Sequence, residues 1–307
     1  MLGEVVPLLR CPVCHGVLSR HDGALRCGAG HSHDIARQGH VTLLAGPAPR
    51  GDTTAMAAAR ARFLEAGHYD WLADLIVEQA DHILRESRNA AGAARADREA
   101  ARAGRDQCVV DAGAGVGFYL AAMLRRLPGD PLGVALDSSR PALRRAARAH
   151  PRIGAVGVDL WRRLPIADGS ADLVLNVFAP RNGAEFHRIL RPDGALFTVT
   201  PNPSHLAELV RRLGLLSVDE TKQERLDRAL GQWFAPERSV ERTTVMTLDH
   251  HSLEALAEMG PSAWHVHAPA MAERIRALPT PVAVAASCQL TVWRPRPTPL
   301  VAPAEDR

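Results

Sequence analysis

The sequence contains almost no lysine, no long apolar run and little net charge. Lys222 is the only lysine among 37 basic residues, which face 34 acidic residues, so the formal net charge is +3. A charge this small over 307 residues argues against a dedicated nucleic-acid binder, which usually shows a stronger basic bias. The abundance of arginine is most simply the codon bias of a GC-rich genome, although arginine is also the residue best suited to bidentate contacts with phosphate.

The absence of a long apolar run excludes several further classes of protein. No run approaches the roughly 18 residues that a membrane-spanning helix needs. The apolar stretch in MLGEVVPLLRCPVC is too short for a secretory signal and lacks a small-residue cleavage site. With 46% hydrophobic residues the chain can nevertheless bury a substantial core, which excludes a disordered polyelectrolyte. We therefore expect a cytoplasmic protein that binds no membrane.

Cysteine is also scarce, and its distribution is uneven. The chain has five cysteines, and an odd number without a secretory signal argues against a disulfide framework. Cys11 and Cys14 form a CxxC motif, and Cys27 begins the segment CGAGH. Three thiolates and an imidazole at this spacing suit a closed tetrahedral structural zinc site. We expect one Zn²⁺ held by Cys11, Cys14, Cys27 and His31, with His15 and His33 as rivals for the fourth position.

The order of the segments indicates four parts. Residues 1–45 form a small Cys/His-rich zinc-binding module, and residues 46–106 form a linker followed by helices that begin at Thr53 or Thr54 and break at Gly67. Residues 107–295 form the main domain, with a helical insertion at about 206–240. Residues 296–307 are a Pro-rich tail that we expect to be disordered.

The main domain alternates strands and helices. Short apolar runs predict buried parallel strands at 108–112, 132–136, 153–158, 172–178 and 195–200, and helical patterns fall between most of them at 117–127, 139–149 and 183–190. This order is typical of a doubly wound α/β sheet. Further strands are expected at 243–248 and 282–293, with a helix at 251–259.

A glycine loop follows the first of these strands. VVDAGAGVGF places Gly113, Gly115 and Gly117 between a strand and a helix, and Asp137 ends the next strand. The loop is neither GxGxxG nor a P-loop, which weakens a dinucleotide or nucleoside triphosphate interpretation. Asp111 before the loop and Asp137 after it complete a pattern that resembles the class I (Rossmann-like) S-adenosylmethionine-dependent methyltransferases. Asp159 ends the third strand, where such enzymes often contact adenine, although a surface acid is nearly as consistent with its position.

The two parts together resemble a narrower family, the bacterial 23S rRNA (guanine-N1)-methyltransferases with an N-terminal zinc module. The sequence segments that carry this resemblance run over roughly residues 8–295. They are CPVCHGVL, the CxxxH with Asp34 after it, ARQGHVTLL, FLEAGHYDWL, VVDAGAGVGFY, NVFAPRN, RILRPDGALFTVTP, SHLAELV and MGPSAWH. Within the family the chain looks closest to the actinomycete branch that protects producers of macrolides such as tylosin and mycinamicin. His40 departs from the tyrosine common in relatives, and Ala114 replaces the Cys or Gly common in the loop.

The resemblance implies an activity, a cofactor and a set of site residues. It implies methyl transfer from S-adenosylmethionine to N1 of a guanine in a 23S rRNA hairpin near the peptide exit tunnel, with macrolide resistance as the role of that branch. The zinc module would recognise RNA. The cofactor would be contacted by Tyr69, Asp111, Gly113, Gly115, Val116, Gly117, Phe118, Asp137, Asp159 and His205. Without the resemblance, Tyr69 would be an ordinary half-buried aromatic and His205 a helix cap.

Further residues follow from the chemistry that such an enzyme needs. Asn176 and Phe178 end the fourth strand, where Asn176 could hydrogen-bond the base edge and Phe178 could stack on it; the alternative is that Asn176 holds the loop and Phe178 is core. Candidate phosphate contacts near the zinc module are Arg10, Arg20, Arg26, Arg37, His40, Arg50, Arg60 and Arg62, each of which could equally be a solvated surface residue.

Two competing functions remain open at this point. A small-molecule methyltransferase, acting on a quinone or polyketide, would show the same glycine loop but would need no separate RNA-binding module. A non-catalytic RNA-binding protein would not need the intact set of acids and glycines. The sequence leaves open whether the chain forms a homodimer.

Overall fold

The computed structural model describes residues 2–47, 49, 51–91, 107–215, 229–260 and 268–297. Parts of three predictions therefore lie outside the described residues: the end of the linker and helices at 92–106, the middle of the helical insertion at 216–228, and the tail from 298 onward.

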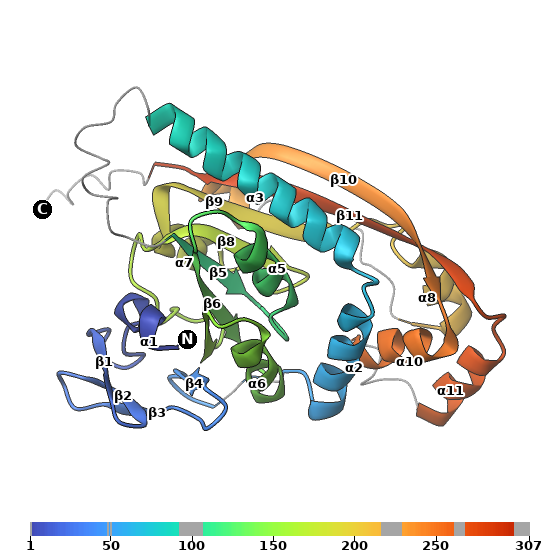
Figure 1. The fold of residues 1–307 in the computed structure, drawn as a ribbon, viewed down its shortest axis with the longest axis horizontal. Coiled ribbons are helices and arrows are strands. Elements are labelled where there is room, and N and C mark those ends of the chain that lie inside the picture. Colours follow the sequence, from blue (N-terminus) through green and yellow to red (C-terminus); the bar gives the residue numbers. More distant parts are fainter. Residues whose placement is uncertain are drawn as a thin grey trace, which may run out of the picture.

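An eight-stranded sheet forms the centre of the molecule (Figure 1). Its strand order is β10-β11-β9-β8-β5-β6-β7-β4. The strands are β4 (Val41–Thr42), β5 (Cys108–Ala112), β6 (Leu132–Asp137), β7 (Ile153–Gly157), β8 (Ala171–Val177), β9 (Leu190–Pro201), β10 (Phe234–Leu248) and β11 (Val282–Pro295). Strands β4 to β9 pair in parallel, whereas β10 and β11 are antiparallel. The five predicted parallel strands are confirmed.

Both faces of the sheet are covered, which explains why its central strands are apolar throughout. All five residues of β5 are buried, and neighbours along the strand enter opposite cores. Val109 packs with residues of α3 (Asp70–Ala91), α5 (Phe118–Arg126) and α6 (Arg140–Ala149). Val110 belongs to the other core, with α7 (Gly183–Ile189) and the N-terminal segment. Side chains of a strand alternate between faces, so a two-sided core requires a continuous apolar run.

The antiparallel end of the sheet corrects one prediction. Strand β10 begins at Phe234, so the helical insertion does not continue to residue 240. The segment before the strand expected at 243–248 is charged, but β10 lies at the edge of the sheet, and most of its side chains are exposed or half-buried. An edge strand tolerates this polarity because it pairs on one side only, here with β11 over its whole length.

The zinc module is joined to the main domain through the sheet itself. Its own sheet contains β1 (Leu18–His21), β2 (Ala24–Cys27) and β3 (Ser32–Asp34), and β4 then adds to the main sheet beside β7. Helix α1 (Leu2–Val5) packs on β7, where a Cβ at Gly154 would lie 2.1 Å from Val5 Cγ2. The module therefore shares its core with the main sheet.

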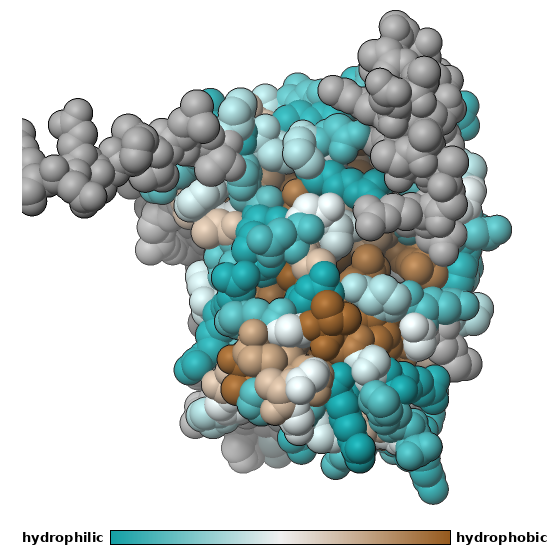
Figure 2. Space-filling view, turned by 90° about the vertical axis from the view of Figure 1, so that its left-hand side faces the viewer, coloured by the Kyte–Doolittle hydropathy of each residue, from teal (hydrophilic) through white to brown (hydrophobic). Residues whose placement is uncertain are grey.

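The surface on the module's side is mixed in polarity. Figure 2 shows this side of the molecule, with a hydrophobic area in its lower half among hydrophilic residues. Val13 and Val17 of the module are both exposed. The module alone is therefore not a uniformly charged surface.

Further helices complete the fold. Helix α2 (Thr54–Glu65) is capped by Thr53, as predicted, and packs against α10 (His250–Met259). Helix α8 (Ala207–Leu213) contacts α11 (Ala268–Arg276) and β11. Among the described residues, no helix is both long and apolar enough to span a membrane.

Candidate functional site

The predicted zinc ligands converge on two adjacent turns. In the first, the Cys11 N–H donates to Gly16 O (2.9 Å) and the His15 N–H donates to Cys11 O (2.9 Å), which forms the knuckle of the CxxC motif. In the second, the Cys27 N–H donates to His31 O (3.1 Å). Both turns present their side chains to the same point, so residues far apart in sequence form one group.

The geometry of this group fits a tetrahedral zinc ion. Cys14 Sγ lies 3.6 Å from Cys27 Sγ, and His31 Nδ1 lies 3.3 Å from Cys27 Sγ and 3.6 Å from Cys11 Sγ. Zn–S bonds of about 2.3 Å and Zn–N bonds of about 2.0 Å place tetrahedral ligand atoms roughly 3.5–3.8 Å apart. All four ligand atoms lie within 4.8 Å of one another.

The rival histidines lie outside that group. His33 Nε2 approaches Cys11 Sγ at 3.7 Å, but the group of four ligand atoms contains His31 instead. His15 is exposed and adopts a left-handed backbone with φ of 59°. The set brought together is therefore the one expected from the spacing: Cys11, Cys14, Cys27 and His31.

The glycine loop connects β5 to α5 at the carboxyl edge of the sheet. Gly113, Gly115 and Gly117 have φ values of 92°, 53° and 82°, which side-chain-bearing residues rarely adopt. A Cβ at Gly113 would also lie only 2.3 Å from Ala179 Cβ, so the segment after β8 crosses directly over the loop. Backbone conformation and close packing thus both require glycine here.

Two acids lie under this loop. Asp137 accepts hydrogen bonds from the N–H groups of Gly115 and Ser139, both at 2.8 Å. Asp111 is buried, and its Oδ2 has no partner among the described residues. Burial, and secondarily the charge of Asp137, raises the pKa of Asp111 to about 8, so this carboxyl is mostly protonated at neutral pH. An unpaired buried carboxyl oxygen beneath a glycine loop fits a ligand that carries hydroxyl and ammonium groups.

The segment before α2 also reaches this edge, which the sequence analysis missed. Ser139 Oγ donates to Asp52 O (2.7 Å), and Arg60 Nε donates to Asp52 Oδ2 (2.9 Å). Arg60 Cδ lies 3.5 Å from the position that a Cβ on Gly115 would take. Asp52 and Arg60 therefore lie against the glycine loop. No local pattern signals this, because the contacts join segments far apart in the chain.

Three predicted residues from distant segments form an aromatic cluster. Tyr69 lies between α2 and α3, Phe178 follows β8, and His205 follows β9. Their ring centroids lie 6.4 Å (Tyr69–Phe178), 6.0 Å (Phe178–His205) and 6.2 Å (Tyr69–His205) apart. Tyr69 and His205 are buried, whereas Phe178 is 43% exposed and has φ of 52°. The exposed ring excludes the alternative that Phe178 is a core residue.

Hydrogen bonds assign the proton in this cluster. The Ser287 N–H donates to His205 Nδ1 (3.1 Å), so the proton of the neutral ring lies on Nε2 and points to Tyr69 Oη at 3.1 Å. Burial lowers the pKa of His205 to about 4 and raises the pKa of Tyr69 well above its ordinary value. Both groups are therefore neutral near pH 7, and the Tyr69 hydroxyl keeps its own proton free to donate.

Asn176 has an amide that is already engaged. Its Nδ2 donates to Ala112 O (2.8 Å) and Pro180 O (3.0 Å), and its Oδ1 accepts from Arg181 Nε (3.4 Å). It is fully buried. In this arrangement Asn176 ties the end of β5 to the NVFAPRN segment, and a contact with a base edge stays a prediction.

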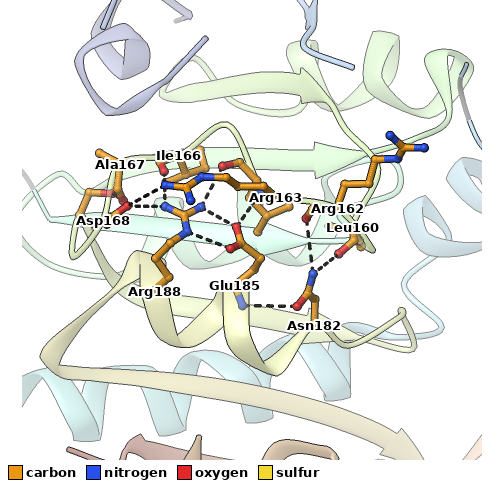
Figure 3. A network of polar contacts seen from close by, with 11 residues as sticks. Leu160, Arg162, Arg163, Ile166, Ala167, Asp168, Asn182, Glu185 and Arg188 are labelled. Atoms are coloured by element: carbon orange, nitrogen blue, oxygen red, sulfur yellow. Dashed lines mark hydrogen bonds and ion pairs between the residues drawn. The ribbon is translucent and has the colours of Figure 1, made fainter. Parts of the chain in front are cut away.

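A polar network fixes the segment that follows β7 (Figure 3). Arg188 of α7 donates to the carbonyls of Leu164 and Ile166 and pairs with Glu185 and Asp168. Asn182 Nδ2 donates to Leu160 O (3.0 Å). This network holds the 160–168 segment against α7.

The same segment carries a ring that the sequence analysis did not single out. Trp161 is 67% exposed. Asp159 lies at its start and accepts from the Trp161 N–H (3.0 Å), while the Leu160 side chain contacts the Cβ position of Gly113. The exposure of Trp161 and the contact of its neighbour Leu160 with the glycine loop identify it in the structure, but neither can be read from the sequence.

The candidate phosphate contacts do not all lie on a free surface. Arg60 is bound to Asp52, and His40 is buried, so contacts of these two residues with phosphate stay a prediction. Arg62 pairs with Glu258, and Arg10 donates to the carbonyls of Pro7 and Leu9. Arg20, Arg26 and Arg37 are exposed, and Arg50 lies outside the described residues.

Comparison with known proteins decides the family. A zinc-ribbon model described as "RlmA, N-terminal" matches residues 9–48, and a methyltransferase-domain model matches residues 109–194. A putative 23S rRNA (guanine-N1)-methyltransferase of Micromonospora griseorubida is 49% identical over 95% of this chain and 99% of that protein. The chain belongs to the 23S rRNA (guanine-N1)-methyltransferase family.

Two further members extend the comparison. The 23S rRNA (guanine(748)-N1)-methyltransferase of Streptomyces fradiae is 46% identical over 97% of this chain and 100% of that protein. A putative member from Bacillus subtilis is 30% identical over 84% of this chain and 87% of that protein. The chain is therefore a class I methyltransferase whose methyltransferase domain takes S-adenosylmethionine and whose zinc ribbon holds a structural zinc ion.

Proposed function

We propose that the chain transfers the methyl group of S-adenosylmethionine to N1 of a guanine in a hairpin of 23S rRNA. The observation that carries the proposal is the match to relatives named for this activity across nearly the whole chain, zinc ribbon included. A small substrate would need no ribbon joined to the sheet edge through β4.

The finer parts of the proposal follow the actinomycete relatives that are 46% and 49% identical to the chain. The guanine is the one numbered 748 in the name of the Streptomyces fradiae relative, in a hairpin near the peptide exit tunnel. Its methylation protects the ribosome against a macrolide. The enzyme acts in the cytoplasm, where ribosomal RNA is found, and a homodimer is its expected assembly.

The residues at the carboxyl edge have distinct tasks in this reaction. The cofactor supplies a methyl group that is already electrophilic, so the protein mainly aligns the nucleophile and excludes water. Asp111, Asp137, the glycine loop and Tyr69 are the proposed cofactor contacts, with Asp159 toward the adenine. Tyr69 and His205 are unsuited to remove the guanine N1 proton, since the pKa of His205 is too low and the Tyr69 hydroxyl stays protonated.

The target base must leave its stack to reach this edge. Phe178 offers an exposed ring beside the Tyr69–His205 pair, and Trp161 offers a second exposed ring on the segment after β7. We propose that Phe178 stacks on the flipped guanine and that Trp161 supports a neighbouring base. Base–aromatic stacking is typically worth about 1–3 kcal/mol per base.

The test is methyl transfer to RNA. Wild-type protein is incubated with labelled S-adenosylmethionine and a 23S rRNA transcript, and modification is mapped by primer extension, because N1-methylguanine blocks Watson–Crick pairing. A new stop at the guanine equivalent to 748 is expected. Asp137→Ala should abolish the stop, whereas Arg238→Gln, on the opposite edge of the sheet, should leave it unchanged. Absence of label on RNA from the wild-type protein would refute the proposal.

The same experiment separates the alternative, a small-molecule methyltransferase. Label in a quinone or polyketide acceptor, with none in RNA, would favour it. For the biological role, expression in a macrolide-sensitive host should raise the inhibitory concentration of tylosin-type drugs, and the Asp137→Ala variant should not. Analytical ultracentrifugation checks the homodimer.

A further inference from the structure

Helix α6 is strongly cationic and contains no acid. Its sequence RPALRRAARA carries Arg140, Arg144, Arg145 and Arg148, all exposed. Arg140, Arg144 and Arg148 are spaced by four residues, so they form one row along the helix, with successive Cα atoms about 6 Å apart.

These arginines have no polar partner among the described residues. Nine arginines of the described residues make neither a side-chain hydrogen bond nor an ion pair. Seven of them lie on α6 or the zinc ribbon: Arg20, Arg26, Arg37, Arg140, Arg144, Arg145 and Arg148. The other two are Arg211 and Arg238. Elsewhere arginines are commonly paired, as Arg60 is with Asp52 and Arg126 with Asp74. The unpaired guanidinium groups are thus concentrated on α6 and the zinc ribbon.

The arrangement is unfavourable for the helix itself. Like charges at i and i+4 repel, and an arginine in the first turn opposes the helix dipole. The first turn of α6 has no acidic residue, and Asp137 just before it already accepts from two backbone N–H groups. A helix that accumulates uncompensated charge in this way is suited to binding an anion.

The row faces the zinc ribbon. Gly39 of the ribbon lies beside Ala147 of α6, with 4.0 Å between its Cβ position and the Ala147 Cβ. Burial, assisted by the charges of Arg144 and Arg140, lowers the pKa of His40, which places these arginines next to the ribbon's last turn. A groove of about 490 Å³ opens at the far end of α6, and its lining includes Arg20, Arg37, Arg148 and His150.

The row also leads to the reaction site. Helix α6 begins directly after Asp137 and Ser139 at the edge that carries the glycine loop, and ends about 15 Å away at the groove. We propose that Arg140, Arg144 and Arg148, with Arg20 and Arg37 across the groove, bind the phosphate backbone of the RNA substrate and lead it from the zinc ribbon to the cofactor edge. We name these five residues the cationic face. The proposal rests on the proposed function.

Arginine suits this task because its planar guanidinium binds phosphate oxygens in pairs. Phosphate contacts position RNA without reading its sequence, so the cationic face supplies affinity and direction, and the aromatic rings at the edge select the base.

The test measures RNA binding by the full-length, zinc-loaded chain as a function of salt. The probe is the 23S rRNA transcript, and binding is followed by filter retention in increasing KCl. Arg144→Gln/Arg148→Gln should weaken binding on the order of tenfold at low salt. It should also reduce the slope of log K against log salt by about one to two, because RNA binding releases fewer counterions when phosphate contacts are lost. Affinity for S-adenosylmethionine should stay unchanged.

Matched variants distinguish charge from structure. Arg238→Gln removes an equally exposed, unpaired arginine at the opposite edge of the sheet and should bind RNA as the wild type does. Arg144→Lys/Arg148→Lys keeps the charge and should keep most of the salt slope. If the Gln double variant bound RNA like Arg238→Gln, the cationic face would be refuted.

The outcome is separable from that of the proposed function. A wild-type enzyme that methylates RNA, with the double variant binding normally, would refute the cationic face alone. A wild-type chain that binds RNA through this face without methylating it would refute the proposed function alone, and one that binds no RNA would refute both.

Discussion

Arginine has opposite roles on α7 and on α6. Arg188 of α7 is 16% exposed and is surrounded by Glu185, Asp168 and two backbone carbonyls (Figure 3). The arginines of α6 are exposed and have no acidic partner in the described part of the chain. The residue type is the same in both places, so the difference comes from whether the fold supplies carboxylates. A paired arginine stabilises the fold, whereas an unpaired one is available to a ligand.

The largest expected effect comes from removing zinc, which should displace two of the five residues of the cationic face. Structural zinc contributes on the order of 10 kcal/mol to the folding of small metal-stabilised modules. Cys27→Ser, or chelation, should therefore unfold β1 to β3 and displace Arg20 and Arg37. Hydrogen exchange should rise over residues 10–35 and remain slow in β5 and β8, and RNA binding should weaken. A zinc-free protein with a fully protected ribbon would contradict this prediction.

Asp111 extends the comparison to a buried carboxyl group whose Oδ2 has no partner among the described residues. Its pKa is raised to about 8 in the folded protein from an ordinary 3.8. Between these pH values the folded state holds one more proton than the unfolded state, so stability falls as the pH rises, by about 1.4 kcal/mol per pH unit. From pH 5 to pH 7.5, urea unfolding should show the wild type losing about 3 kcal/mol relative to Asp111→Asn. Parallel pH profiles for the two proteins would refute the shift.

Arg188 is the paired arginine in the comparison between α7 and α6, and its replacement should affect stability. Arg188→Gln leaves the largely buried Glu185 carboxylate without its cationic partner, and breaking a pair of this kind costs about 3 kcal/mol. Urea denaturation should show this loss. The salt slope of RNA binding should remain that of the wild type, and a changed slope would mean that the paired network also contacts RNA.

Arg144 should give a small effect of the opposite sign. Arg144→Gln removes repulsion with Arg140 and Arg148, each worth about 0.2–0.5 kcal/mol. The variant should unfold at a slightly higher temperature while binding RNA less tightly, and Arg238→Gln should change neither property. A clear loss of stability in Arg144→Gln would show that α6 uses this arginine for its own packing.

Local patterns predicted much of the fold and part of the site. The strands of the parallel sheet were predictable because burial on both faces demands continuous apolar runs, and the zinc ligands because two short turns bring them together. The glycine loop was predictable from glycines whose positive φ values are required by the turn. Each of these features depends on residues close together in sequence.

The errors and omissions involve contacts between distant segments. Residues 234–240 form an edge strand because β11 pairs with them, although the helical insertion was expected to reach about residue 240. Arg60 lies against Gly115, and His40 lies buried beside α6, because distant segments pack together, and the local sequence of either segment does not indicate this packing. The α6 arginines lie far from the zinc module in the sequence, so proximity along the chain does not predict that they lie beside it.

The scarcity of lysine and the small net charge describe the composition of the chain but not where its charges lie. The sequence by itself determined that almost every cation is arginine, that a Cys₃His group can hold zinc, and that a glycine loop lies between a strand and a helix. Only the tertiary structure decided which arginines meet a carboxylate. That decision depends on chain segments brought within a few ångströms by packing, because an ion pair is a property of distance in space and not of separation along the chain.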